Sequence, residues 1–170
     1  MTKQDTLENQ AKSVYLGIGS NLGNKVNNIE KAKFLLSQKD IRILQSSSFY
    51  ESLSWPNPKK PKFLNIVLRV RTVYEPIELL KKCKEIEKKL GRKKKAKNLP
   101  RECDIDILDY NKKKMEKDII LPHPRMHTRN FVIIPLFELN KEWIHPISKL
   151  NIKKLILSLS NRDIRSIKQI

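Results

Sequence analysis

Residues 63–72 constrain the fold most strongly, because their side chains alternate in character over the length of a full strand. The even positions from 64 to 70 are uniformly apolar: Leu64, Ile66, Leu68 and Val70. The odd positions mix apolar, amide and cationic side chains: Phe63, Asn65, Val67, Arg69 and Arg71. Successive side chains of a β-strand point to opposite faces of the sheet. The pattern therefore predicts a strand with one uniformly apolar face.

The flanking segments predict three further strands and two helices in a regular order. Residues 13–19, 41–51 and 102–110 are typical of strands. Apolar residues from Leu22 to Leu36 recur at steps of 4, 3, 3 and 4, which predicts a helix ending near Lys39. A second helix opens at Glu75-Pro76 and stops at Gly91. Residues 128–139 and 152–159 predict two more helices.

The order β-α-β-β-α-β predicts an α+β, ferredoxin-like sandwich, with one antiparallel sheet, helices on one face and extra helices at the C-terminus. Residues 1–12 are expected to form a flexible leader, and residues 13–170 a single domain. Residues 52–61 form an irregular, proline-rich loop, and residues 92–100 a basic loop without apolar periodicity.

Length and composition exclude several classes of protein. A chain of 170 residues suits one domain with a buried core. No apolar run approaches the ~20 residues that span a bilayer, so no membrane association is expected. The polar N-terminus resembles no secretion signal, which favours a cytoplasmic protein. Cys83 and Cys103 are then expected to be buried, reduced thiols.

The net charge of +18 invites a nucleic-acid interpretation. However, 27 of the 36 cationic residues are lysine, whereas arginine makes most bidentate phosphate and base contacts. Residues 81–97 alone contribute +8, part of which is the solvated face of the second helix. An RNA-binding module with an RRM-like fold is the alternative function, although no strand has the stacking aromatics of that module.

Asp104 and Asp106 form the strongest local signal for chemistry. On a strand their carboxylates project from the same face, roughly 6.5–7 Å apart at the Cα atoms. Two adjacent carboxylates repel unless a cation lies between them, and Mg²⁺ prefers oxygen ligands of this kind. An exposed pair on a solvated edge strand is the alternative interpretation.

The basic residues before this pair favour a phosphoryl-transfer site. Arg92, Arg101 and the lysines at 93, 94, 95 and 97 would neutralise the carboxylates if nothing else were bound. Carboxylate, Mg²⁺, phosphate and cationic side chain form a consistent alternation of charge, in which charge stabilisation and positioning provide the catalysis. Neither a P-loop nor a protein-kinase motif is present.

A second cluster, residues 121–131, places two histidines and two arginines on a turn held by two prolines: His123, Arg125, His127 and Arg129. The cluster is interpreted as a rigid turn that presents cations to an anion. Asn65 shares a strand face with Phe63, and a buried Asn needs partners for its donors and its acceptor. A heteroaromatic ligand bearing an amide would satisfy Asn65, and so would nearby backbone.

Five segments, in order, resemble the signatures of the 6-hydroxymethyl-7,8-dihydropterin pyrophosphokinase family of folate biosynthesis. They are residues 15–23, 47–51, 63–65, 100–108 and 121–131, and Pro100-Arg101-Glu102-Cys103-Asp104-Ile105-Asp106 opens the hallmark strand. The resemblance implies transfer of pyrophosphate from ATP to the pterin hydroxymethyl group, with release of AMP. It also implies two Mg²⁺ ions and a product that passes to dihydropteroate synthase.

The resemblance further implies the roles of individual residues. Asp104 and Asp106 would hold both metal ions, and Arg92 and Arg101 would act on the phosphates. The remaining residues that would contact ATP are Glu87, Ile107, His123 and Arg129. The residues that would bind the pterin are Ser52, Phe63, Asn65 and Phe131, with Phe131 stacked on one face of the ring.

Some positions depart from the family pattern. Where the loop before the hallmark strand often carries Trp-Gly or another aromatic, this chain has Asn98-Leu99. The second face of the pterin would then be covered by Leu99, by Trp55 or by another loop. A nucleotide sensor that binds ATP without turnover is a further, non-enzymatic interpretation of the same site.

Overall fold

The computed structural model describes residues 11–54, 57–92 and 99–170, whose strands form one antiparallel sheet. The order across the sheet is β5-β1-β4-β3-β6, and β2 also pairs with β4. The bounds of the strands are β1 Lys12–Ser20, β2 Arg42–Ser46, β3 Tyr50–Ser52, β4 Phe63–Thr72, β5 Asp104–Tyr110 and β6 Lys168–Gln169. The ferredoxin-like prediction is confirmed, and the predicted strand at 63–72 has the bounds of β4.

Residues 41–51, predicted as one strand, form two. Both β2 and β3 pair with β4, and Ser47 lies in the gap between them. The Ser47 N–H donates to the carbonyl of Val67 at 2.9 Å, and the Val67 N–H donates to Ser47 Oγ at 2.9 Å. The serine side chain thus replaces a ladder hydrogen bond where the strand bends.

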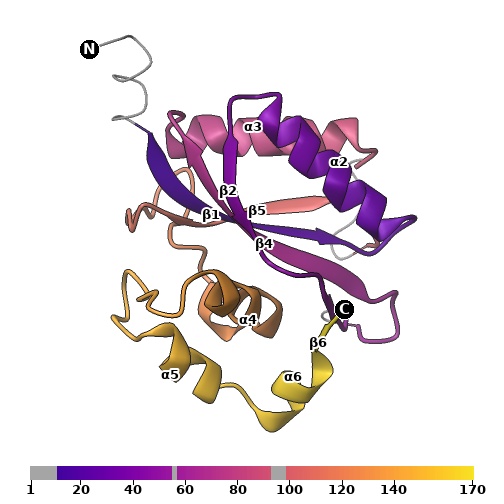
Figure 1. Cartoon of the computed structure of the whole chain (residues 1–170), viewed down its shortest axis with the longest axis vertical. Coiled ribbons are helices and arrows are strands. Elements are labelled where there is room, and N and C mark those ends of the chain that lie inside the picture. The colour runs from indigo at the N-terminus through magenta and orange to yellow at the C-terminus, as the bar shows by residue number, and fades with distance from the viewer. Residues whose placement is uncertain (1–10, 55–56, 93–98) are drawn as a thin grey trace.

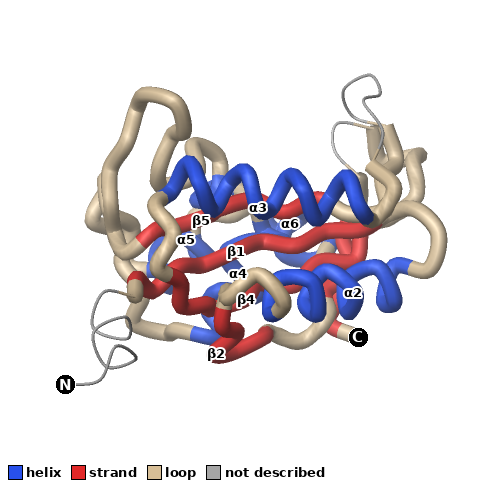
Figure 2. The backbone as a smooth tube through the Cα atoms, turned by 90° about the horizontal axis from the view of Figure 1, so that it is seen from above, coloured by secondary structure: helices blue, strands red, loops and turns tan. Residues whose placement is uncertain are grey.

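The helices cover both faces of the sheet: the two helices of the β-α-β-β-α-β order share one face, as predicted, and the C-terminal helices lie on the other (Figure 1). Their bounds are α2 Lys25–Ser37, α3 Pro76–Lys89, α4 Asn130–Leu139, α5 Ile152–Leu157 and α6 Asn161–Ser166, with a 3-10 turn, η1, at Met126–Thr128. Helices α2 and α3 lie across one face (Figure 2), and α4, α5 and α6 lie beneath the other. The C-terminal extension therefore packs on the sheet instead of projecting from it.

Each face has its own apolar core. Under α2 and α3, alternate residues of the strands, such as Leu16, Ile18 and Ile66, are almost completely buried together with Cys83 and Cys103. The core beneath α4 and α5 takes residues of the opposite parity: Tyr15, Val67 and Leu108. The polar-looking face of the strand at 63–72 is therefore only partly polar, because α4 covers its centre.

Local sequence explains where the helices begin and end. The Asn24 side chain caps α2 by accepting a hydrogen bond from the N–H of Asn27 at 3.0 Å. Pro76 occupies the first turn of α3, as predicted, and Gly91 follows its end with a φ of 103°, a value that a side chain disfavours.

The predicted leader falls mostly on residues 1–10, which lie outside the described residues, and β1 begins at Lys12. Among the described helices, none has the length and apolar character needed to cross a membrane.

Candidate active site

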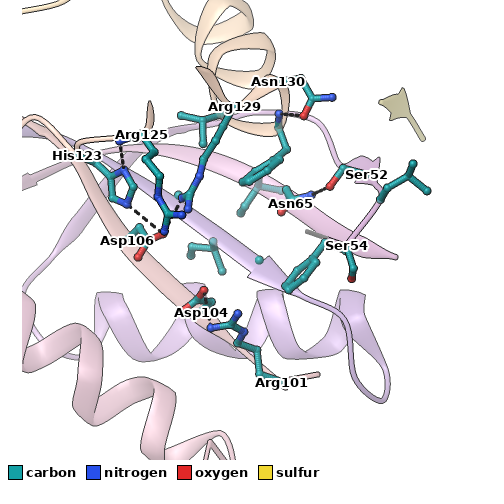
Figure 3. Close-up of a pocket in the computed structure, with 18 of the residues that line it drawn as sticks. Ser52, Ser54, Asn65, Arg101, Asp104, Asp106, His123, Arg125, Arg129 and Asn130 are labelled. Carbon is teal, nitrogen blue, oxygen red and sulfur yellow. Dashed lines mark hydrogen bonds and ion pairs between the residues drawn. The ribbon is translucent and has the colours of Figure 1, made fainter. Parts of the chain in front are cut away.

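A pocket of about 1090 Å³ opens on the α4 side of the sheet. Its floor is formed by β1, β4 and β5, and its walls by residues 123–132, by the segment around Arg101 and by α6. Figure 3 shows the carboxylates of Asp104 and Asp106 on the floor, with Arg101, His123 and Arg129 directed at them.

Glycine residues of β1 leave this floor uncovered. Gly17 is paired with Asp106, and Gly19 lies between Asp104 on one side and Asn65 on the other. A Cβ atom at Gly19 would lie 3.1 Å from Asn65 Oδ1 and 3.3 Å from Cδ1 of Phe63, closer than side chains normally approach. The glycines therefore let the carboxylates and Asn65 face one open space.

Asp104 is held between two guanidinium groups. Its Oδ1 lies 2.5 Å from Nη1 of Arg92, and its Oδ2 lies 3.1 Å from Nη1 of Arg101. Within the described chain, Nε of Arg101 is buried without a hydrogen-bond partner. A buried donor of this kind favours an anionic acceptor, because an unmade hydrogen bond leaves its desolvation uncompensated.

Asp106 faces the second pair of basic side chains, but at longer range. Its Oδ2 lies 3.6 Å from Nη1 of Arg129 and 3.9 Å from Nε2 of His123. Burial lowers the pKa of His123, an effect that Arg129 and Arg125 reinforce and Asp106 opposes. At neutral pH the imidazole is therefore mainly uncharged, and it offers hydrogen bonding more than positive charge.

Glu87 lies behind the pocket and anchors one of its cations. The side chain is 1% exposed, and its Oε1 accepts the N–H of Ile105 at 2.7 Å. Its Oε2 lies 2.5 Å from Nη1 of Arg92, and Lys84 donates to Oε1 at 2.8 Å. Arg92 thus bridges α3 and β5 by pairing with a carboxylate on each.

The other end of the pocket is aromatic and amide-bearing. Asn65 is 5% exposed and donates through Nδ2 to Ser52 Oγ at 3.0 Å and to the Tyr50 carbonyl at 3.3 Å. The Phe131 ring centroid lies 5.5 Å from Cζ of Arg129, and the Phe63 centroid lies 5.8 Å from Cζ of Arg101. These cation–π contacts hold the aromatic end and the charged end of the pocket together.

The structure brings ten of the twelve predicted site residues to the pocket wall: Ser52, Phe63, Asn65, Arg92, Arg101, Asp104, Asp106, His123, Arg129 and Phe131. Glu87 and Ile107 are not on the wall. Ile107 is 4% exposed and belongs to the core under α2 and α3, on the opposite face from the carboxylates. A contact from Ile107 to ATP therefore stays a prediction that its side chain does not support.

Leu99 lines the pocket and is 38% exposed. Trp55 and the lysines of the basic loop lie outside the described residues.

Sequence reasoning missed one wall of the pocket. Its residues are Ser160, Arg162, Asp163 and Ser166 from the C-terminal segment, together with Asn130, which lies in the predicted segment 121–131 but has no predicted role. Helix α6 has six residues and buries none of them, so it has no apolar periodicity to detect. Arg125, a residue of the predicted basic turn, also lines the pocket.

The donor set fits a magnesium ion that shares its coordination with a ligand. The described residues contain no group of three or more His, Cys, Asp or Glu side chains that could form an all-protein metal cage. Mg²⁺ usually binds through one or two carboxylates and completes its octahedron with water and phosphate oxygens. Asp104 and Asp106, side by side over an open floor, provide that number of protein ligands.

Comparison with known proteins gives a consistent result. The sequence model of the 7,8-dihydro-6-hydroxymethylpterin-pyrophosphokinase (HPPK) family matches residues 15–141. A relative in Aquifex aeolicus named 2-amino-4-hydroxy-6-hydroxymethyldihydropteridine pyrophosphokinase is 41% identical over 143 residues, which cover 84% of this chain and 89% of that protein. A relative of the same name in Bacillus subtilis is 36% identical over 127 residues, covering 74% of this chain and 76% of the relative.

Other relatives are considerably longer. The folic acid synthesis protein fol1 of Pneumocystis carinii is 36% identical over 96% of this chain, which spans 22% of that protein. Among solved structures, the Plasmodium falciparum HPPK-DHPS triple mutant with pteroate has a TM-score of 0.73 at 15% identity. That likeness covers 94% of this chain and 47% of the other, and at this identity it concerns the fold alone.

Proposed function

This chain belongs to the 7,8-dihydro-6-hydroxymethylpterin-pyrophosphokinase family, enzymes that transfer pyrophosphate in folate synthesis, and we propose how its pocket performs that reaction. ATP occupies the charged end and 6-hydroxymethyl-7,8-dihydropterin the aromatic end. The pterin hydroxymethyl oxygen attacks the β-phosphorus, and AMP leaves. The adjacency of Asp104 and Asp106 to four basic side chains, a few ångströms from an amide-bearing aromatic pocket, carries the proposal.

Asp104 and Asp106 would hold Mg²⁺, and we propose two ions, as the triphosphate presents several oxygens at once. When bound, Mg²⁺ neutralises charge on the phosphates and keeps the attacked phosphorus electrophilic. The carboxylates make this possible because they are the only pair on the open floor among the described residues.

Arg92, Arg101 and Arg129 would exchange partners when the ligands bind. In the present structure they pair with the two aspartates. Once the carboxylates are occupied by metal, the guanidinium groups are available for phosphate oxygens, to which they can donate two parallel hydrogen bonds. Glu87 keeps Arg92 at the wall during this exchange, since it pairs with the same Nη1 atom from behind. His123 would add a neutral hydrogen bond beside them.

Ser52, Phe63, Asn65 and Phe131 would bind the pterin. Asn65 reads the amide edge of the ring, and its orientation is fixed by Ser52 and the Tyr50 carbonyl. Phe131 stacks on one face of the ring, and Phe63, which lies over Gly19, lines the pocket beside it. Leu99, which lines the pocket, would shield the bound ligands from solvent and so limit hydrolysis of ATP.

The residues on the uncovered sheet surface argue against the alternative function, RNA binding. The uncovered face of β1 and β5 carries Gly17, Gly19, Asp104 and Asp106, so it offers carboxylates where single-stranded RNA requires stacking aromatics and positive charge. We also propose that the product passes to dihydropteroate synthase, a step suggested by the HPPK-DHPS structures that resemble this chain.

The direct test is to incubate the protein with MgATP and 6-hydroxymethyl-7,8-dihydropterin and to identify the nucleotide product. AMP, formed in equal amount to the pterin pyrophosphate, is expected. Removal of Mg²⁺ with EDTA should abolish turnover, and added Mg²⁺ should restore it. ADP as the product, or AMP formed without the pterin, would contradict the proposed reaction.

A further inference from the structure

The last eleven residues form a polar strap across one side of the pocket. This C-terminal strap, residues 160–170, consists of α6, β6 and the residues that join them. Ser160, Arg162, Asp163 and Ser166 line the pocket. No residue of α6 is fully buried, so the strap has no apolar core of its own. Hydrogen bonds hold it at its two ends.

Asn130 anchors the beginning of the strap to the start of α4. Its Nδ2 donates to the Asp163 carbonyl at 2.7 Å and to Ser166 Oγ at 3.1 Å. Its Oδ1 accepts the backbone N–H of Phe131 at 2.7 Å (Figure 3). One amide side chain therefore ties the strap to the backbone of the residue whose ring is proposed to stack on the pterin.

The end of the strap is anchored to β3. Strand β6 pairs with β3 through Gln169 opposite Tyr50 and Lys168 opposite Glu51. The N–H of Ile170 donates to the carbonyl of Phe49 at 3.0 Å. Strand β3 ends at Ser52, which accepts the hydrogen bond from Asn65. The strap thus connects the element that carries Phe131 with the element that carries Ser52.

We propose that Asn130 is a positioning residue for the pterin. Through the strap it fixes the Phe131 backbone relative to Ser52 and Asn65, and so sets the spacing between the stacking ring and the amide-reading edge. The inference rests on the proposed function. Stacking depends on ring separation and offset. Loss of the strap would therefore weaken pterin binding. Arg92, Arg101 and the proposed metal ligand Asp104 come from other elements, so the charged end of the pocket would be preserved.

The decisive variant is Asn130→Asp, with Asn130→Ala and Ser166→Ala beside it. Aspartate keeps the Oδ1 acceptor for the Phe131 N–H and favours the first turn of a helix, so α4 should not be weakened. It loses the Nδ2 donor, and its second oxygen faces the Asp163 carbonyl that accepted from it. Alanine removes both anchors without adding charge. Asn161→Ala, an exposed asparagine of α6, is the matched control.

Pterin affinity is measured by ligand fluorescence, and affinity for a non-hydrolysable ATP analogue by calorimetry. We expect the pterin Kd to rise about five- to tenfold in Asn130→Asp and Asn130→Ala, the loss of roughly one net hydrogen bond or slightly more. The Kd of the ATP analogue should change less than about twofold. An unchanged pterin Kd would overturn the inference, as would an equal loss for both ligands, which indicates a general structural role.

Amide hydrogen exchange of the ligand-free protein tests the strap without reference to function. Exchange over residues 160–170 should accelerate several-fold in Asn130→Asp, but not in Asn161→Ala. If the unmodified protein does not bind the pterin, the proposed function fails, while the exchange data still decide whether Asn130 holds the strap. Unaltered exchange in Asn130→Asp would refute the inference.

Discussion

The two faces of the sheet are built from the same strands, yet one is a closed apolar core and the other is divided. On β1, Leu16 and Ile18 point toward α2 and α3 and are almost completely buried. Their neighbours, Gly17 and Gly19, lie on the opposite face of the strand, and because they have no side chain they leave an open floor for the pocket. The part of that second face around Tyr15, Val67 and Leu108 is covered by apolar contacts, under α4 and α5.

Because of this difference, alternate residues of one strand serve different ends: those on one face stabilise the fold, and those on the other form the pocket. The covered face carries the larger of the two apolar clusters. The divided face holds two adjacent carboxylates, which repel each other and are offset by Arg92, Arg101 and Arg129. Substitutions that differ by one residue along a strand should consequently have different kinds of effect, and the following experiments test that expectation.

Removing a carboxylate from the pocket floor should have the largest effect. Asp106→Ala should reduce kcat/KM on the order of a thousandfold, because a metal ligand at the reacting phosphates is lost. The free energy of unfolding should change by less than about 1 kcal/mol, since the side chain is 35% exposed. AMP release and urea denaturation measure the two quantities. Glu116→Ala, an exposed carboxylate outside the pocket, serves as control, and a variant with near-normal turnover would disprove the metal assignment.

Truncation on the covered face should have the opposite profile. Ile18→Ala removes a side chain that is 1% exposed and should lower the free energy of unfolding by about 2–5 kcal/mol. Turnover of the folded fraction, assayed well below the denaturation midpoint, should remain within about threefold of normal because the Ile18 side chain packs in the core under α2 and α3. Loss of activity without loss of stability would contradict the separation of the two faces.

Adding a methyl group to the pocket floor should produce an intermediate effect that depends on position. At Gly19 the new Cβ would press on Asn65 and Phe63, and the KM for the pterin should rise about tenfold, equivalent to roughly 1.4 kcal/mol. At Gly17 the closest atoms are side-chain carbons of Leu108 at 3.4 Å, an ordinary contact. Gly17→Ala should therefore change the pterin KM less than about twofold. Equal effects from steady-state kinetics of both variants would rule out the assignment of Asn65 and Phe63.

The smallest effect concerns pH and a polar contact beneath the divided face. Burial and a hydrogen bond to Glu138 raise the pKa of Tyr50 to about 12 from 10.0. The folded state thus holds the phenolic proton more tightly than the unfolded chain. Its contribution to stability should be complete below pH 10 and should disappear as the pH rises through about 12. The difference in unfolding free energy between the unaltered protein and Tyr50→Phe should show this decline, and a difference that grows above pH 10 would contradict it.

Local patterns predicted the elements whose residues carry a strong period. The alternation at 63–72 predicted β4, and Pro76 and Gly91 predicted the limits of α3 closely. The prediction for the region from Gln38 to Ser52 was less accurate. Its single predicted strand is divided at Ser47, where the side chain takes over a backbone hydrogen bond, and a period of two residues does not reveal such a replacement.

The candidate site, too, could be predicted from sequence only in part. Asp104 and Asp106, two residues apart on one strand, could be paired from sequence because strand geometry fixes their common face. The contribution of α6 could not, since its contacts to Asn130 span more than thirty residues and involve single polar atoms. The sequence also did not predict on which face the C-terminal helices pack, because the strand pattern alone did not show that Tyr15, Val67 and Leu108 need a cover.

The sequence by itself determined the order of helices and strands along the chain, which residues of each strand are apolar, the carboxylate pair and the ordered motifs of the family. These depend on spacing along the chain, which backbone geometry converts directly into a common face. Only the tertiary structure decided which cation pairs with which carboxylate, that Glu87 pairs with Arg92, and that the C-terminal strap joins the start of α4 to β3. Those contacts join residues distant in sequence, and their partners are selected by the packing of the whole sheet and its helices.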